Sequence, residues 1–233
     1  YVKHFTLNDA LKDKKVFISF QGVATSIFVW INGNFVGYSE DSFTPSEFEI
    51  SDYLVEGDNK LAVAVYRYST ASWLEDQDFW RLYGIFRDVY LYAIPKVHVQ
   101  DLFVKGDYDY QTKAGQLDID LKTVGDYEDK KIKYVLSDHE GIVTEGDASV
   151  NGDGELSVSL ENLKIKPWSA ESPKLYNLTL HVLDDGQLVE VVPVKVGFRH
   201  FEIKDKLMLL NGKRIVFKGV NRHEFNARTG RCI

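Results

Sequence analysis

The chain has almost no cysteine, no long apolar segment and almost no helical patterning, and each absence excludes a class of protein. The single cysteine, Cys232, excludes an internal disulfide framework and favours a reducing compartment and hence a cytoplasmic location, with a secreted protein free of disulfides as the alternative. No apolar run approaches the roughly 20 residues that a membrane helix needs, so we expect no membrane partner. The chain begins with Tyr1 and has no signal peptide, and we therefore expect a piece of a longer protein.

The charge balance and the composition narrow the class further. Asp and Glu number 35 against 28 Lys and Arg, which gives a formal net charge of −7. An acidic surface repels phosphate backbones, so we expect no nucleic-acid partner. Aromatic residues make up 13% of the chain, and such rings fill the faces of sheets. The composition therefore favours an all-β protein.

Apolar and polar residues alternate along most of the chain, which is the pattern of half-buried strands. The dipeptides Asn32-Gly33 and Asn211-Gly212 separate apolar runs and predict hairpins, because both central residues of a type I′ turn take positive φ. We expect almost no helix. The predicted strands cover residues 16–20, 27–31, 35–38, 61–66, 89–92, 97–104, 117–121, 131–136, 156–160, 175–182, 188–196, 207–210 and 214–217.

Pro95 marks the predicted boundary between two sandwiches, because proline cannot donate to a strand ladder. Beyond it, several predicted strands over about 100 residues are separated by turn signals, which is typical of an immunoglobulin-like sandwich. The acidic run 125–131 predicts a solvated hairpin tip. Five histidines have no partner pattern and are expected at surface or edge positions: His4, His98, His139, His181 and His200.

The first segment with possible chemistry is 73–81, which reads Trp-Leu-Glu-Asp-Gln-Asp-Phe-Trp-Arg. In an extended backbone, Asp76 and Asp78 point to the same side. Carboxylates beside aromatic rings such as Trp80 suit a sugar, whose hydroxyls need hydrogen-bond partners and whose C–H faces lie on rings. A hard cation with oxygen ligands fits equally well. The alternative is a solvated acidic loop whose tryptophans fill the core, and spacing alone favours this alternative.

The second segment is 221–224, Asn-Arg-His-Glu, which follows the apolar run 215–217. Barrel enzymes place functional groups at the carboxyl ends of strands, and this pattern fits such a position. No second histidine follows at the spacing of a zinc-binding helix. A salt-bridged strand end without chemistry is the alternative.

Several motifs in order resemble one family, the glycoside hydrolases of family 2 of the β-galactosidase type. The motifs that resemble its sugar-binding domain, the end of its immunoglobulin-like domain and the entry into its catalytic barrel are 43–48, 74–80 and 84–89, then 167–169 with 173–176, then 218–224. The resemblance covers nearly the whole chain and keeps the family's order.

The resemblance implies an all-β layout with three parts. Residues 1–95 are expected to form the later part of a jelly-roll-type sandwich that binds sugar. Residues 96–203 are expected to form an immunoglobulin-like β-sandwich, and residues 204–233 a short β-hairpin segment that opens a TIM barrel. The implied function is part of a retaining enzyme that hydrolyses terminal β-D-galactosides such as lactose. The full-length protein is expected to be a homo-oligomer.

The resemblance also implies roles for single residues. By this resemblance, Asp78 is expected to bind the galactose 6-hydroxyl and a sodium ion. His223 is expected to support the galactose ring in the transition state. The two catalytic glutamates and the magnesium ligands are expected beyond Ile233, so no catalytic residue is assigned and the chain alone is expected to be inactive. The expected supporting residues are Asp76, Trp80, Asn221, Arg222 and Glu224.

Two other functions compete with this interpretation. A carbohydrate-binding scaffold protein would also be built from sandwiches, but it has no use for the opening strand of a barrel. An enzyme of the same family that acts on another sugar, a β-glucuronidase or a β-mannosidase, would share the layout. The stretches 76–80 and 84–88 favour the galactoside.

Overall fold

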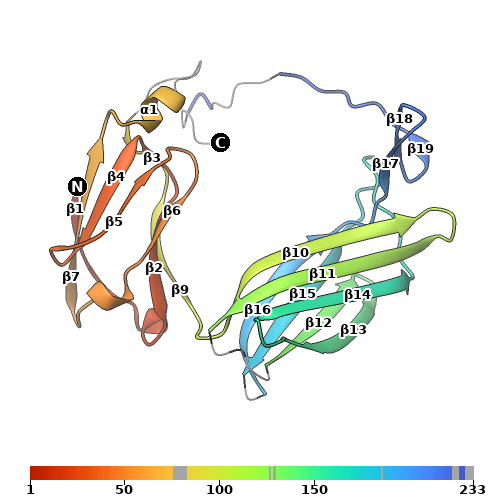
Figure 1. Ribbon diagram of the computed structural model, residues 1–233, viewed down its shortest axis with the longest axis horizontal. Coiled ribbons are helices and arrows are strands. Elements are labelled where there is room, and N and C mark those ends of the chain that lie inside the picture. Colours follow the sequence, from red (N-terminus) through yellow and green to blue (C-terminus); the bar gives the residue numbers. More distant parts are fainter. Residues whose placement is uncertain (76–82, 126, 128–129, 185, 222–225, 229–233) are drawn as a thin grey trace. The chain divides into compact units, whose positions relative to one another are not determined.

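The computed structural model of the chain describes residues 1–75, 83–125, 127, 130–184, 186–221 and 226–228. The chain divides into two compact units, Tyr1–Ile94 with Val220–Ile233 and Pro95–Gly219. In the described part, helix is confined to one turn, α1 (Ala71–Leu74), and to two 3-10 turns, Asp9–Leu11 and Ser51–Tyr53 (Figure 1). None of the helices there has the length and apolar character to cross a bilayer. The prediction of an all-β chain is confirmed.

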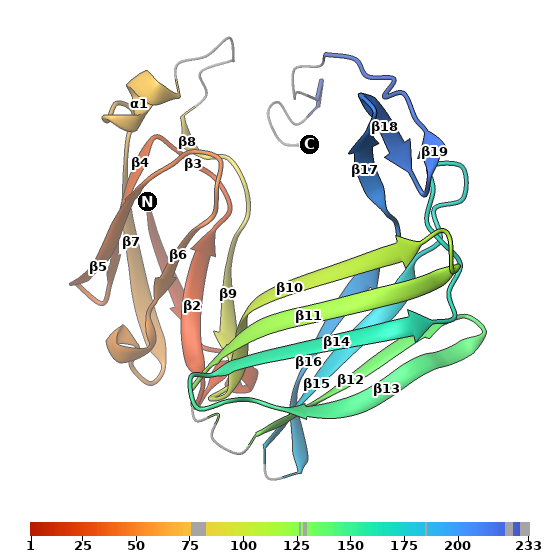
Figure 2. The ribbon, with the colours of Figure 1, turned by 45° about the vertical axis from the view of Figure 1, so that its right-hand side comes forward.

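The first unit contains two antiparallel sheets, in the orders β1-β7-β4-β5 and β6-β2-β9, and a short pair, β3-β8. Figure 2 shows β2 and β9 on one side of this unit and β4, β5 and β7 on the other. Its strands are β1 (Val2–Thr6), β2 (Lys15–Phe20), β3 (Val23–Ala24), β4 (Ser26–Ile31), β5 (Asn34–Glu40), β6 (Ser46–Glu49), β7 (Asp58–Tyr66), β8 (Gly84–Ile85) and β9 (Val89–Ile94).

The core of the first unit is formed by alternate residues of its strands. Ile27, Val29 and Ile31 of β4 are buried against apolar residues of β2 in one cluster. Phe28 and Trp30, between them, point to the other face, where their rings lie 6.2 Å apart and nearly parallel. This period of two is what a strand dictates, since successive side chains leave opposite faces of a sheet.

Both predicted Asn-Gly hairpins are confirmed. Asn32 and Gly33 connect β4 to β5 with φ of 52° and 85°. Asn211 and Gly212 make the equivalent turn with φ of 51° and 75°. Positive φ at both central residues is the type I′ signature, which asparagine and glycine tolerate better than other residues.

The second unit is a sandwich of two antiparallel sheets, in the orders β10-β11-β14 and β13-β12-β15-β16. The two sheets lie one behind the other as layers (Figures 1 and 2). A sandwich with three strands in one layer and four in the other has the architecture of immunoglobulin-like domains. The strands are β10 (His98–Asp109), β11 (Ala114–Val124), β12 (Lys131–Asp138), β13 (Gly141–Ser149), β14 (Glu155–Leu163), β15 (Tyr176–Asp184) and β16 (Gln187–Val196).

The core of the second unit lies between its two sheets. Leu117 and Ile119 of β11 and Leu178 and Leu180 of β15 are almost completely buried in one cluster. They come from opposite sheets, and the intervening residues of each strand are more exposed. The strict alternation at 117–121 therefore identified a core-facing strand correctly.

The acidic run 125–131 is not a hairpin tip, which corrects the prediction. A hairpin would pair β11 with β12, but β11 pairs with β10 and β14, and β12 pairs with β13 and β15. The run is the crossing from one sheet to the other. At Gly125, with φ of 100°, a Cβ would lie 1.7 Å from the carbonyl oxygen of Lys96, so only glycine fits. Charge content predicts exposure, but it does not specify which strands pair.

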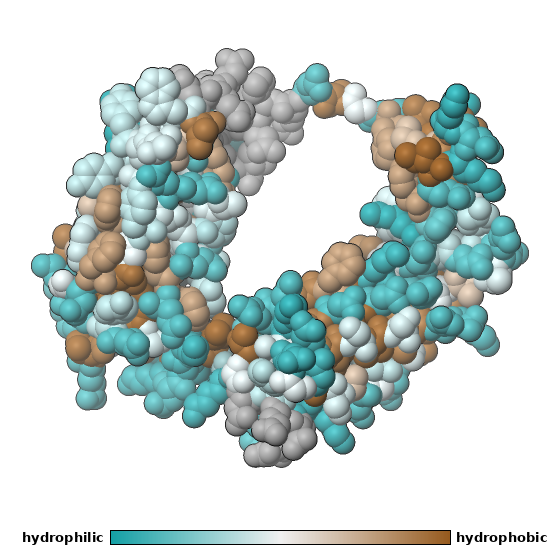
Figure 3. All heavy atoms as spheres, viewed as in Figure 1, coloured by the Kyte–Doolittle hydropathy of each residue, from teal (hydrophilic) through white to brown (hydrophobic). Residues whose placement is uncertain are grey.

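The last strands of the second unit form a small sheet, β17 (Phe201–Lys204), β18 (Leu207–Leu210) and β19 (Lys213–Arg214). The strand predicted over 214–217 ends at Arg214, and Phe217 is 70% exposed. Apolar side chains gather over this segment, brown in Figure 3. Val216 and Phe217 have strand-forming side chains, but no described strand pairs with them. Without a pairing partner, composition alone does not form a strand.

Candidate functional site

The structure describes the flanks of both predicted functional segments. Asp78 and His223 lie outside the described residues, and so do four of the supporting residues, Asp76, Trp80, Arg222 and Glu224. Asn221 is described and exposed, with no regular secondary structure. In the described part, no group of three or more His, Cys, Asp or Glu side chains is arranged to hold a metal ion. The geometry of the site therefore comes from residues 71–75 and from the elements that contact them.

Residues 71–75 form a helical turn, and the positions 76 and 78, for which an extended backbone was considered, lie outside the described residues. The Glu75 amide donates to the carbonyl of Ala71 at 2.8 Å, which closes the turn of α1. Ala71 is buried, but Trp73 is 84% exposed. Trp73 is therefore not a core plug, because the turn buries Ala71 and places the indole on the outside.

Glu75 is held by a loop far away in the sequence. Its Oε1 accepts the Ser42 amide at 2.7 Å, and its Oε2 accepts the Ser42 hydroxyl at 2.6 Å. Ser42 is 1% exposed. An ionised carboxylate only accepts hydrogen bonds, and here each oxygen already has a donor. Glu75 is thus a structural anchor, held by the fold through both of its oxygens.

The beginning of α1 is fixed by the same region. Glu40, the last residue of β5, accepts the Ala71 amide at 2.8 Å through its Oε2. The Tyr38 hydroxyl contacts the other oxygen of this carboxylate. The first amides of a helical turn have no partner within the turn, so a carboxylate there satisfies a free donor. Glu40 and Ser42 therefore hold the two ends of the turn.

The loop that carries Ser42 is itself well ordered by hydrogen bonds. Asp41 accepts the amides of Phe43 and Thr44 at 3.0 and 3.1 Å, and it also contacts the Thr44 hydroxyl. The Thr44 hydroxyl and then the Phe43 amide hold the pKa of Asp41 below its ordinary value. These bonds stabilise the ionised carboxylate and close a tight turn around it.

Arg87 connects this loop to the third motif. Its Nη1 donates to the carbonyl of Phe43 at 2.8 Å and to that of Gln21 at 3.2 Å. The rings of Phe43 and Phe86 lie 6.0 Å apart. The motifs 43–48 and 84–89, separate in sequence, therefore meet in space, and Glu75 of the motif 74–80 contacts Ser42, the residue directly before the first of them. No periodicity or spacing in the sequence could have predicted these contacts.

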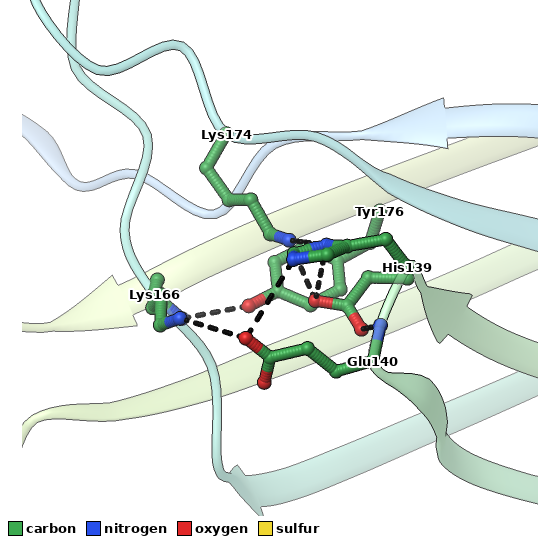
Figure 4. Close-up of polar contacts among 6 residues, drawn as sticks. His139, Glu140, Lys166, Lys174 and Tyr176 are labelled. Carbon is green, nitrogen blue, oxygen red and sulfur yellow. Dashed lines mark hydrogen bonds and ion pairs between the residues drawn. The ribbon is translucent and has the colours of Figure 1, made fainter.

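A second polar cluster lies in the second unit, between the β12–β13 turn and the loop 164–175 (Figure 4). Lys174 pairs with Asp138 at 2.6 Å, and their side chains are 17% and 9% exposed. Lys166 pairs with Glu140 at 3.2 Å, and its amide donates to the Tyr176 hydroxyl at 2.8 Å. The charges of the cluster thus pair with one another, and they attach the long loop to the sandwich.

This cluster predicts acid sensitivity. The hydrogen bond from Lys174 holds the pKa of Asp138 below its ordinary value of 3.8. A depressed pKa contributes stability above the unfolded value, and this contribution is lost as the pH falls through the folded value. Asp138→Asn should therefore lower the urea midpoint at pH 7. Its difference from wild type should shrink as the pH falls below 3.8, the ordinary value, and through the lower pKa of the folded protein.

The matched control is Asp153→Asn, which changes an exposed carboxylate of the same unit. It should change the urea midpoint little at any pH, since surface charges contribute little. A constant difference between Asp138→Asn and wild type from pH 7 to pH 2.5 would mean that the carboxylate charge does not stabilise this loop.

Comparison with known families matches the chain in three consecutive parts. The sugar binding domain of the glycosyl hydrolases family 2 matches residues 1–95, and the domain named Glycosyl hydrolases family 2 matches residues 97–199. The TIM barrel domain of the same family matches residues 201–233.

Curated relatives with high identity are β-galactosidases. The chain is 97% identical over 233 residues to that of Streptococcus thermophilus and 56% identical over 236 residues to that of Clostridium acetobutylicum. It is 47% identical over 234 residues to that of Lactobacillus delbrueckii subsp. bulgaricus. All of the chain is covered in each case, but it spans only 23%, 26% and 23% of the length of these relatives.

Solved structures of β-glucuronidases share the fold. The β-glucuronidase of an uncultured Clostridium species has a TM-score of 0.80 and 26% identity, covering 100% of this chain and 40% of that one. The Bifidobacterium dentium β-glucuronidase in complex with coumarin-3-O-glucuronide has a TM-score of 0.83 at 21% identity, covering 99% and 44%. With three parts of one family matched in order along its length, the chain belongs to glycosyl hydrolase family 2.

Proposed function

We propose that this chain is the non-catalytic, pocket-contributing part of a β-galactosidase that hydrolyses terminal β-D-galactosides such as lactose with retention. The observation that carries the proposal is the 97% identity to the Streptococcus thermophilus β-galactosidase over the whole chain. In this proposal 1–95 is a jelly-roll-type sugar-binding domain, 96–203 an immunoglobulin-like sandwich and 204–233 the opening of the catalytic barrel. The ranges of the three family matches support this division.

The chain contributes binding and leaves the bond-breaking chemistry to the rest of the enzyme. Retaining hydrolysis needs two carboxyl groups about 5 Å apart across the scissile bond. We assign neither to this chain, and the two hydrogen bonds from Ser42 give Glu75 the role of a structural anchor. The whole enzyme supplies the two glutamates and the magnesium ligands, and it acts as a homo-oligomer in the cytoplasm without nucleic-acid or membrane partners.

Two residues of the chain contact the sugar in this proposal. The carboxylate of Asp78 accepts the galactose 6-hydroxyl and also coordinates sodium, since an acceptor-only group serves both. His223 supports the ring through a hydrogen bond that strengthens in the transition state. The anchored turn before Asp76 and the exposed position of Asn221 are the described features nearest to them in sequence. The supporting residues are Asp76, Trp80, Asn221, Arg222 and Glu224.

A β-glucuronidase is the second candidate, because solved β-glucuronidases share the fold. The sequence identity of this chain to the solved β-glucuronidases is 20–26%. Its identity to the curated β-galactosidases is 44–97%. Fold is shared across substrates within a family, while substrate choice depends on the residues of the pocket. The higher identity therefore favours the galactoside, and it favours an enzyme over a carbohydrate-binding scaffold.

Hydrolysis by the full-length protein tests this function. The kcat/KM for nitrophenyl β-galactoside should greatly exceed that for the matching β-glucuronide and β-mannoside. The 233-residue chain alone should release no nitrophenol from any of them. A preference for the glucuronide would replace the galactoside with the second candidate, and turnover by the chain alone would refute its non-catalytic role.

A further inference from the structure

The start of the acidic segment 75–78 is attached to a buried point of the first unit. Glu75 receives two hydrogen bonds from Ser42, through the amide at 2.7 Å and the hydroxyl at 2.6 Å. We propose that Ser42 and Glu75, the Ser42–Glu75 clamp, are positioning residues that set where the carboxylates after Glu75 meet the substrate. This inference rests on the proposed function, in which Asp78 binds the galactose 6-hydroxyl and sodium.

The clamp is suited to positioning because its Ser42 side does not move freely. Ser42 is buried between β5 and β6, and the loop around it is closed by the hydrogen bonds of Asp41. Arg87 holds the next residue, Phe43, through its carbonyl. The donors for Glu75 are thus fixed by the fold before any ligand is present. Pre-formed geometry of this kind lowers the ordering cost of binding.

The turn before Glu75 is held at its other end as well. Glu40 accepts the Ala71 amide at 2.8 Å, so residues 40 and 42 of one loop hold residues 71 and 75 of another. Two points of attachment fix both the position and the direction of the turn. A single bond would leave the turn free to rotate.

Chain geometry limits how far the influence of the clamp extends. Three residues of fully extended chain span at most about 10 Å, and Asp78 is three residues after Glu75. The clamp is therefore separated from Asp78 by no more than about 10 Å of backbone length after Glu75. A shift of about 1 Å in a positioning group is enough to weaken a bound contact strongly, so release of Glu75 should be felt at Asp78.

The two residues of the clamp can be substituted separately, and the two substitutions should weaken the clamp to different extents. Glu75→Gln keeps the shape and removes the charge. Its one remaining oxygen can accept the Ser42 amide, but its NH₂ group can only donate to the Ser42 hydroxyl, so neither hydrogen bond has a charged partner any longer. Ser42→Ala removes only the hydroxyl and keeps the hydrogen bond from the backbone amide of residue 42 to Glu75. Glu56→Gln, an exposed glutamate of the same unit, is the matched control.

The experiment uses the full-length protein and two readouts that a purely structural role would not change. The first is the sodium concentration for half-maximal hydrolysis of nitrophenyl β-galactoside. The second is the ratio of kcat/KM for this substrate to that for its 6-deoxy analogue. Glu75→Gln should raise the first and lower the second, each by about tenfold, the scale of one lost hydrogen bond to a charged group.

The relative sizes of the effects in the different variants provide a further test. Ser42→Ala should have a smaller effect than Glu75→Gln, and the double variant should equal Glu75→Gln because both changes break the same contact. Glu56→Gln should behave as wild type. At saturating sodium, the remaining loss in Ser42→Ala and Glu75→Gln should appear in KM more than in kcat, because the clamp positions a binding contact.

The possible failures are distinguishable. If the wild-type protein hydrolyses no galactoside and shows no sodium dependence, the proposed function fails. If wild type is active but Ser42→Ala and Glu75→Gln lower only the melting temperature, with both readouts unchanged, the clamp is a structural contact and the inference is overturned. Amide hydrogen exchange of residues 71–75 in the same protein reports whether each variant has released the turn, and protection equal to wild type in Glu75→Gln also contradicts the clamp.

Discussion

Replacing Asp78 by asparagine in the full-length protein should remove most of its preference for a galactoside over the analogue that lacks the 6-hydroxyl. A hydrogen bond to a charged group contributes about 1.5–3 kcal/mol, so the ratio of kcat/KM for the two substrates should fall roughly 10- to 150-fold. Sodium dependence should weaken with it, because a neutral amide is a poorer ligand for a hard cation than a carboxylate. Steady-state kinetics with both substrates, at low and high sodium, measures both effects.

Asp76→Asn is the matched control for Asp78→Asn, since it changes the same residue type two positions earlier in the same segment. Because Asp76 is a supporting residue, its replacement should lower the ratio of kcat/KM for the two substrates much less than Asp78→Asn does. If Asp76→Asn narrows the ratio and Asp78→Asn does not, Asp76 is the residue that contacts the sugar. If neither variant changes the ratio or the sodium dependence, both are surface carboxylates, and the assignment by resemblance was wrong.

Replacing His223 by alanine should lower kcat by roughly 10²–10³-fold, the scale of one lost transition-state donor. A hydrogen bond that strengthens only in the transition state lowers the barrier without tightening ground-state binding, so KM should change much less than kcat. Steady-state kinetics of the full-length variant with nitrophenyl β-galactoside measures the two constants separately.

Thermal unfolding separates this role from a structural one. His223→Ala should melt near the wild-type temperature, as should His4→Ala, which changes an exposed histidine of β1 and should keep full activity. An unchanged kcat together with a lowered melting temperature would show that His223 stabilises the end of the segment and takes no part in the reaction.

The strands and the core could be predicted from the sequence because both depend on local patterns. The alternation at 117–121 identified the buried residues of β11, and the two Asn-Gly pairs identified hairpins whose turns require positive φ. Strand β13 (Gly141–Ser149) was missed because its residues are mostly polar and partly exposed. It forms because β12 offers it a pairing edge.

Contacts between distant residues could not be predicted, because they depend on which elements the fold brings together. Glu75 and Ser42 are 33 positions apart, and no spacing rule connects them. The same is true of His98 and Glu190, which contact each other at 2.6 Å between β10 and β16. The sequence shows no partner pattern for His98, and the structure supplies a partner from the other sheet of the sandwich.

The segment after Arg214 shows the opposite case, in which a local pattern predicts a strand that the fold does not form. Residues 215–217 have strand-forming side chains, and the amide of Ile215 still donates to Met208 at 3.0 Å. Beyond it the described residues offer no further ladder, and Val216 and Phe217 are exposed. Strand propensity largely measures how well a residue packs on neighbours, so it predicts little where no neighbour is present.

The most direct test is a structure of the full-length protein with galactose bound. The central claim is that the first unit of this chain supplies a contact to the sugar. A carboxylate oxygen of Asp78 should lie at a hydrogen-bonding distance of roughly 2.5–3.0 Å from the 6-hydroxyl oxygen, with sodium coordinated by the same carboxylate. A 6-hydroxyl contacted only by residues from outside this chain would contradict the claim.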